Sequence, residues 1–349
     1  METHNSFRAM IMDSMAAAPP PPELPEEPAR SHTYKENMFR LMRHEKPYWI
    51  PVASENNLVI PDVVLERPAL NRGGKDWFGV EWQYVENIHA PSIAPGFVLF
   101  EEAEEWRTAL KFPDLDAIDW EKNAELICRE LDPDKANAFV LFNGCFERLH
   151  SLMGFENALC AMLTDPEEIS DLFHAIADFK IKLIDRLITY YPVDTIVYHD
   201  DWGTNDNTFF SDEMYEELLF EPTKKIVDFV HSKGKFFTLH CCGRVEKLIP
   251  HMLKLNIDSW ESAQMKINDL PAIRQMVGNR LCMETIIMND TLMDPSAGEE
   301  RVRAAVKETL EILASTGSLI LTRLNQCAPE NMYWVSDEFY KISNSIYAD

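Results

Sequence analysis

The stretch Phe236-Phe237-Thr238-Leu239-His240-Cys241-Cys242-Gly243 is an apolar run of β-strand type that ends in a histidine, two cysteines and a glycine. Side chains alternate between the two faces of a strand, so His240 and Cys242 point the same way with Cα atoms about 6 to 7 Å apart. Cys241 points to the opposite face. Imidazole and thiolate are ligands that zinc prefers. The stretch therefore predicts a strand that ends in half of a metal site.

A second apolar run, residues 318–322, leads to Cys327, which can supply another sulfur ligand from a nearby strand end. Three protein ligands with an open fourth position are typical of catalytic rather than structural zinc. Cys241 is a competing ligand, because a bulge at the strand end would turn it toward the site. Glu261 and Glu284 end two further predicted strands and are candidates for the fourth ligand or for a hydrogen bond to His240.

Apolar runs of strand type alternate with amphipathic helical runs from the middle of the chain onward, which is typical of βαβ units on a parallel sheet. An eighth strand between residues 55 and 100 would complete the count of a (β/α)₈ TIM barrel, whose active-site groups gather at the carboxyl ends of the strands. A doubly wound open sheet is the alternative, and it also gathers the strand ends at one edge. The predicted strands are 48–53, 138–143, 195–199, 236–240, 257–260, 281–285 and 319–322.

The length of 349 residues fits one barrel domain over residues 34–349 with local elaborations. Four consecutive prolines at 19–22 stand in a segment with little to bury, so we predict a flexible N-terminal arm over residues 1–33. The aromatic residues between 73 and 97, among them Trp77, predict a hairpin or lid over the barrel mouth. Packing in the core is the simpler interpretation of that aromatic cluster.

The net charge of −25 disfavours nucleic acid or an anionic membrane surface as a partner, because both would repel the protein. The seven cysteines are odd in number and scattered, which indicates a reducing cytoplasm rather than a disulfide framework. No apolar window approaches the length of a transmembrane helix, and the N-terminus lacks the layout of a signal peptide. We expect a cytoplasmic protein with a small-molecule substrate. A homodimer stays open, because the sequence does not reveal the oligomeric state.

Two acids, Asp200 and Asp201, directly follow the predicted strand 195–199. Paired carboxylates can share a proton and act as a general acid, or they can position a polar group of a substrate. Capping of a turn is the alternative role for either acid. Trp202 and Asn205 follow in the same segment and Asn143 ends another predicted strand, so we expect these three to contact a substrate at the strand ends.

The chain resembles the uroporphyrinogen decarboxylase-like superfamily, and within it the zinc-dependent corrinoid methyltransferases, over most of its length. The resemblance rests on segments 76–82, 146–148, 154–157, 200–204 and 240–243 and on Cys327. It implies that His240, Cys242 and Cys327 bind zinc. Uroporphyrinogen decarboxylases carry an arginine-containing stretch after the first strand, whereas residues 49–55 here contain no arginine and end in Glu55. Porphyrinogen decarboxylation is therefore disfavoured, and Glu55 becomes a candidate substrate-binding residue.

The resemblance implies a methyl transfer from a small methyl donor to the cobalt(I) of a separate corrinoid protein that binds transiently. We expect a methoxylated aromatic donor, as in an O-demethylase, because Trp77, Trp202 and other aromatic side chains can form a flat apolar slot. A methylcobamide:thiol methyltransferase of the coenzyme M type is one alternative, because zinc with two thiolate ligands suits a thiol substrate. A uroporphyrinogen decarboxylase-like lyase is the other.

Overall fold

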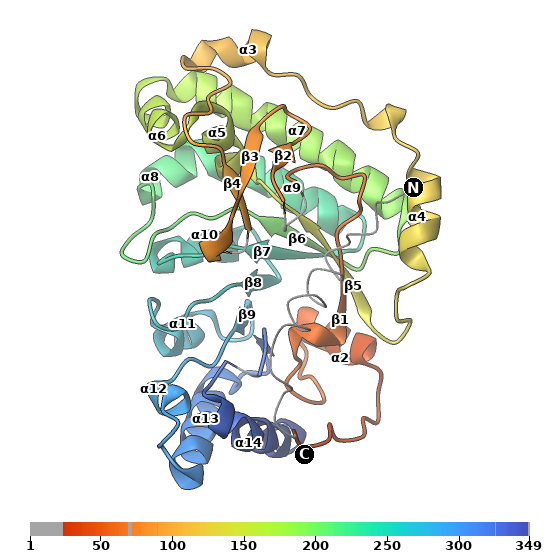
Figure 1. The fold of residues 1–349 in the computed structure, drawn as a ribbon, viewed down its shortest axis with the longest axis vertical. Coiled ribbons are helices and arrows are strands. Elements are labelled where there is room, and N and C mark those ends of the chain that lie inside the picture. The colour runs from red at the N-terminus through yellow and green to blue at the C-terminus, as the bar shows by residue number, and fades with distance from the viewer. Residues whose placement is uncertain (1–23, 69–71, 89, 325, 348–349) are drawn as a thin grey trace.

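The computed structural model describes residues 24–68, 72–88, 90–324 and 326–347. Its centre is a curled, seven-stranded parallel sheet with the strand order β1-β5-β6-β7-β8-β9-β10 (Figure 1). All neighbouring pairs in this sheet are parallel, as the alternation of strand and helix patterns predicts. The strands are β1 (Asn56–Val59), β5 (Ala136–Leu141), β6 (Thr195–His199), β7 (Phe236–His240), β8 (Ser259–Glu261), β9 (Cys282–Thr285) and β10 (Leu319–Leu321).

The two edges of the curled sheet meet at one point. Val52 forms a parallel bridge with Leu321 of β10, and the Leu321 N–H donates to the Pro51 carbonyl over 2.9 Å. A 3₁₀ turn at Ala53–Glu55 then leads from Val52 into β1. The sheet therefore curls into a TIM-type barrel, which is the predicted fold class.

The predicted strand 48–53 is reduced to this single bridge, and that prediction is wrong in its extent. Two backbone N–H groups of the segment, those of Tyr48 and Trp49, donate to the side chain of Asn37 instead of to a strand. Pro51 has no N–H to offer a neighbouring strand. The extra strand expected between residues 55 and 100 is present as β1, which pairs with β5.

Helices surround the sheet, and the longest of them is α7 (Figure 1). Pro166 stands at its first position and acids fill its first turn, both of which favour a helix start. No helix within the described residues has the length and hydrophobicity that a membrane span requires. The helices are α2 (Tyr34–Met42), α3 (Trp106–Ala109), α4 (Trp120–Cys128), α5 (Cys145–Met153), α6 (Phe155–Thr164), α7 (Pro166–Tyr190), α8 (Asp212–Met214), α9 (Phe220–Ser232), α10 (Ile249–Lys254), α11 (Leu270–Val277), α12 (Asp290–Met293), α13 (Glu299–Leu313) and α14 (Met332–Ser345), with a π-helical turn at Tyr215–Leu219 between α8 and α9.

The amino ends of the strands are covered by α2. Its buried Met38 and Leu41 pack in one cluster with Ala136 and Cys282, which are the first residues of β5 and β9. Residues 1–23 of the predicted N-terminal arm lie outside the described residues. Within the rest of that segment, Arg30 donates to the Asn344 side chain over 2.7 Å. The carboxyl ends of the strands, at the opposite end of the barrel, are left for a functional site.

A separate three-stranded antiparallel sheet is inserted between β1 and β5. It consists of β2 (Gly74–Lys75), β3 (Glu81–Val85) and β4 (Ala90–Ile93). The adjacent aromatic residues pack on the helical layer, where the rings of Trp77 and Phe78 lie 6.3 and 5.4 Å from that of Phe179 in α7. Packing is therefore the observed role of this cluster, and the action of the sheet as a lid stays a prediction.

Candidate metal centre

The structure brings His240 and Cys242 together at the end of β7. The Cys242 Sγ lies 3.5 Å from the His240 Nε2. In a tetrahedral zinc site, ligand distances of about 2.0 Å to nitrogen and 2.3 Å to sulfur place those two atoms about 3.5 Å apart. Cys241 is fully buried, and its thiol contacts the Cys242 carbonyl at 3.7 Å. The pair thus has the spacing of two ligands of one zinc ion, and the alternation expected from an extended strand holds.

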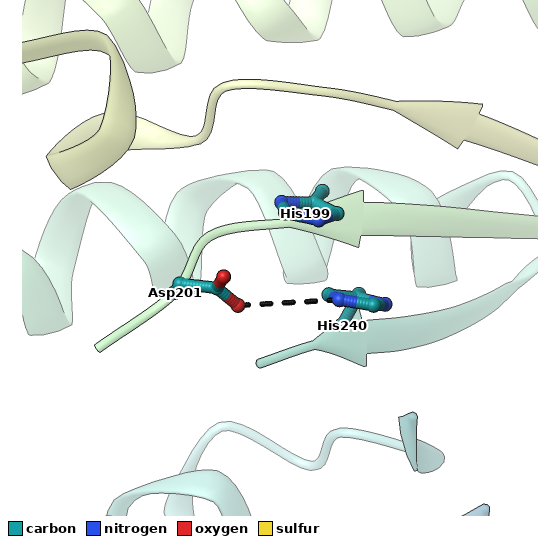
Figure 2. A group of neighbouring side chains, drawn as sticks. All are labelled: His199, Asp201 and His240. Carbon is teal, nitrogen blue, oxygen red and sulfur yellow. Dashed lines mark ion pairs between the residues drawn. The ribbon is translucent and has the colours of Figure 1, made fainter. Parts of the chain in front are cut away.

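A second set of potential ligands surrounds His240. One potential ligand atom from each of His199, Asp201 and His240 lies within 4.8 Å of the others, and Figure 2 shows the three side chains at neighbouring strand ends. Asp201 Oδ1 is 4.0 Å from His240 Nε2 and accepts the Cys242 N–H over 2.6 Å. The rings of His199 and His240 are stacked, with centroids 4.0 Å apart and planes 12° apart. Two imidazoles and a carboxylate are a donor set that binds zinc and other divalent transition metals.

Glu261, predicted as a metal ligand, faces the other nitrogen of the His240 ring. Its Oε2 lies 3.5 Å from His240 Nδ1, whereas Cys242 and Asp201 approach Nε2. Burial lowers the pKa of His240, but the hydrogen bonds to Cys242 and Glu261 and the Glu261 charge together raise it well above its usual value. This position suits a carboxylate that orients the imidazole, which is the alternative role given above, and ligation by Glu261 stays a prediction.

Cys327 does not join the group. The one set of three potential ligands found among the described residues is His199, Asp201 and His240, without Cys327. Cys327 is nearly buried in the loop after β10, where burial raises the pKa of its thiol. Of the three predicted ligands, His240 and Cys242 are thus seen to lie together. Zinc ligation by Cys327 stays a prediction. Five residues separate Cys327 from the end of β10, and the sequence does not fix the path of that loop.

The two adjacent acids at the end of β6 have different environments. Asp200 is fully buried and accepts hydrogen bonds from the backbone N–H of Glu147, at 2.9 Å, and from the Trp202 indole, at 3.0 Å. Burial and the Glu147 charge raise the pKa of Asp200 to about 7. The side chain of Asp201 is 32% exposed and faces His240. Asp201 is therefore the acid within reach of a substrate, and Asp200 anchors the start of α5.

His199 and Glu147 form a pair that sequence reasoning missed as site residues. The Glu147 Oε2 lies 2.9 Å from the His199 Nδ1, which leaves Nε2 free to act at the site. Burial is the main cause that lowers the pKa of His199 to about 3, and burial also raises the pKa of Glu147 to about 7. The imidazole is therefore neutral at neutral pH, as a metal ligand requires. The signal in the sequence was the position of His199 at the end of the strand that pairs with β7.

Three of the predicted substrate-binding residues lie in different surroundings in the structure. Trp202 is fully buried and supports Asp200, so it lines no substrate surface. Asn143 is buried in a left-handed conformation (φ 55°) and donates to the Glu66 carbonyl. Asn205 is exposed in the loop after β6. None of these three is seen to contact the group at His240.

Glu55 and Trp77, the two other residues predicted to contact a substrate, have other contacts in the structure, and their substrate-binding role stays a prediction. Glu55 directly precedes β1, whose first residue pairs with the first residue of β5, so Glu55 lies at the amino end of the sheet. Its carboxylate accepts from the Trp49 indole at 3.0 and 3.2 Å. Trp77 packs against α7, as described above. The absence of an arginine in segment 49–55 therefore says nothing about the chemistry at the carboxyl ends.

Gly243 lets two loops of the site approach each other closely. Its φ is 95°, and a Cβ atom there would collide with the backbone of Gly203. We expect Gly243→Ala to lower the free energy of unfolding by about 3 kcal/mol, because left-handed strain adds to a displacement of backbone. Gly234→Ala is the matched control, since Gly234 has φ 68° but open space around it, and it should cost about 1 kcal/mol. Urea unfolding checks both, and equal losses would contradict the collision.

The fold and the site define an α/β barrel protein with metal-ligand side chains at the carboxyl ends of its parallel strands. The family model for uroporphyrinogen decarboxylase (URO-D) matches residues 75–322, and the chain belongs to this family. A structure described as a methyltransferase from Methanosarcina mazei superposes with a TM-score of 0.63 at 15% identity, covering 91% of this chain and 100% of that one. At this identity the likeness shows the shared fold. No curated protein matches the chain.

Proposed function

We propose that this member of the URO-D family is a zinc-dependent methyltransferase that moves a methyl group from a methoxylated aromatic to the cobalt(I) of a separate corrinoid protein. The 3.5 Å separation of His240 Nε2 and Cys242 Sγ carries the proposal, because it suits two ligands of one zinc ion. The fold shared with a protein described as a methyltransferase supports the same class of reaction.

His240 and Cys242 would hold the zinc, with the remaining ligands drawn from Cys327 or from Asp201 and His199. Zinc bound there supplies a Lewis acid that offsets negative charge on the leaving oxygen. Glu261 holds the His240 ring in place through Nδ1, and Glu147 does the same for His199. Each of these carboxylates thereby leaves the opposite ring nitrogen directed toward the site.

We assign Asp201 to the leaving group in the case where Cys327 completes the zinc site, because a carboxylate that binds zinc has no proton to donate. Its Oδ1 accepts the Cys242 N–H, which leaves Oδ2 to hold a proton or to accept one from a bound substrate. Donation of that proton to the ether oxygen would make the phenol a better leaving group. Asp200 cannot share this role, because its carboxylate is buried beneath α5.

The corrinoid protein would dock at the carboxyl end of the barrel, where the cobalt can approach the methyl group opposite the leaving oxygen. The test is a mixture of purified protein, reduced corrinoid protein and a panel of methoxylated phenols, methylamines and methylthiols. We expect loss of the cobalt(I) absorbance with the methoxylated phenols, at a rate at least tenfold above that with the other donors. Transfer from methylcobamide to a thiol, without reaction of any ether, would instead assign the thiol-methylating alternative.

A further inference from the structure

The cation Arg67 stands at the same end of the sheet as the metal centre. The guanidinium carbon of Arg67, in the segment after β1, lies 3.5 Å from the ring centroid of Phe142. The Phe142 ring lies 5.5 Å from that of His199, which stacks on His240 at 4.0 Å. The four planar groups thus follow one another along the strand ends, from Arg67 to the candidate metal ligands.

Arg67 has no anionic partner among the described residues. Its Nε is buried without a hydrogen bond, and no carboxylate within the described part of the chain comes within 4.0 Å of its guanidinium nitrogens. Arg148, by contrast, is paired with Glu66 and with Asp76. A buried guanidinium nitrogen without an acceptor is costly, because it has lost water and gained no hydrogen bond. Such a group is typical of a site that a ligand completes.

Two acids lie near enough to influence Arg67 without binding it. Burial is the main cause that lowers the pKa of Arg67 to about 10, and the charges of Glu147 and Asp201 oppose this shift. Arg67 is therefore charged at neutral pH. Glu147 is engaged by His199 and Asp201 by the Cys242 N–H, so neither acid occupies the guanidinium fork. The planar fork matches a carboxylate, which it can bind through two parallel hydrogen bonds.

We propose that Arg67 binds a carboxylate of the methyl donor, so that the substrate is a small anionic compound rather than a neutral one. This inference rests on the proposed function for the identity of the ligand as a methyl donor. The contact with Phe142 covers one face of the guanidinium and directs its edge to the incoming carboxylate. Arg67 is thus a binding residue that selects the substrate by charge.

The test compares 3-methoxybenzoate with its neutral analogue 3-methoxybenzamide by isothermal titration calorimetry, on the full-length zinc-loaded protein without the corrinoid partner. The wild-type protein should bind the carboxylate at least about tenfold more tightly than the amide. Arg67→Met should abolish that preference, and Arg67→Lys should retain part of it, because a lysine keeps the charge but loses the fork. Arg67→Met removes no side-chain hydrogen bond seen within the described residues, so it should fold normally.

Arg43→Met is the matched control. Arg43 also contacts a ring, that of Phe39 at 5.5 Å, but it is exposed beside α2 at the amino end of the barrel. This variant should keep the full preference for the carboxylate. Equal affinity of the wild-type protein for the two compounds, no measurable binding of the carboxylate at millimolar concentration, or an unchanged preference in Arg67→Met would each overturn the inference.

The binding assay separates this inference from the proposed function. A preference for the carboxylate that depends on Arg67, in a protein that methylates no cobalt, would refute the methyl transfer and retain the carboxylate site. Equal methyl transfer from anionic and neutral donors by the wild-type protein and by Arg67→Met would refute the carboxylate site and retain the methyl transfer.

Discussion

His240→Ala is expected to leave the purified protein without zinc and to lower the rate of cobalt methylation by more than about 100-fold. This loss should exceed the one caused by substituting a residue that only hydrogen-bonds to a metal ligand. His240 belongs to both candidate donor sets, since it lies 3.5 Å from the Cys242 sulfur and also forms the group with His199 and Asp201. Metal analysis by mass spectrometry and the cobalt(I) absorbance measure the two losses. Full activity of a zinc-free His240→Ala protein would refute the mechanism.

Two variants show whether the loss is specific. Glu261→Gln keeps a hydrogen-bonding group beside His240 Nδ1, so it should weaken zinc binding by about 10- to 100-fold and still reach one zinc per chain at saturating metal. Cys282→Ser changes a buried thiol at the start of β9, at the opposite end of the barrel from Cys242. It should keep its zinc, whereas Cys242→Ser should lose both zinc and methyl transfer.

The identity of the third ligand follows from the same measurement. Cys327→Ser loses zinc if the sulfur-rich set implied by the family resemblance holds the ion. Asp201→Ala loses zinc if the group seen in the structure holds it. The two sets also differ in donor type, because a second thiolate donates more electron density than a carboxylate, which makes the zinc a weaker Lewis acid and favours a thiol substrate. The pair of variants therefore bears on the substrate as well as on the metal.

The sequence predicts the barrel because most of its strands are short apolar runs that alternate with helical segments. Residues 236–240 and 195–199 are short apolar runs between helical segments, and both are strands with the predicted bounds. Alternation within the first of them also predicts that His240 and Cys242 share a face. The segment 48–53 satisfies the same pattern, yet the backbone N–H groups of its first two residues donate to the side chain of Asn37, a residue of α2. A local pattern does not show such a competing partner from another element.

The candidate site depends on tertiary contacts that the sequence does not contain. Asp200 and Asp201 are adjacent and identical in type, and only the start of α5 above Asp200 makes one buried and the other accessible. His199 becomes a site residue because β6 pairs in register with β7, so that it lies opposite His240. Strand pairing of this kind can be predicted once the barrel fold is predicted. The path of the loop that carries Cys327 cannot be predicted in this way.

A buried ion cluster joins the inserted antiparallel sheet to the barrel. Arg148 in α5 contacts Glu66 at 2.7 Å and Asp76 at 2.6 Å, and Lys180 in α7 contacts Glu66 at 2.8 Å. The four side chains are at most 1% exposed. Asp76 also accepts the backbone N–H groups of Phe78 and Val80, so it fixes the turn that leads into β3. The guanidinium of Arg148 therefore links the sheet insertion to α5.

Arg148→Met should lower the free energy of unfolding by about 3 to 5 kcal/mol, because it leaves two carboxylates buried with too few partners. Arg303→Met is the control, since Arg303 contacts three carboxylates where Arg148 contacts two, but its cluster lies at the surface, with side-chain exposures up to 55%. Screening by water should limit that loss to about 1 kcal/mol. Urea unfolding measures both variants. Equal losses would mean that burial adds nothing to the Arg148 cluster, and the inserted sheet would then be held by its aromatic contacts with α7.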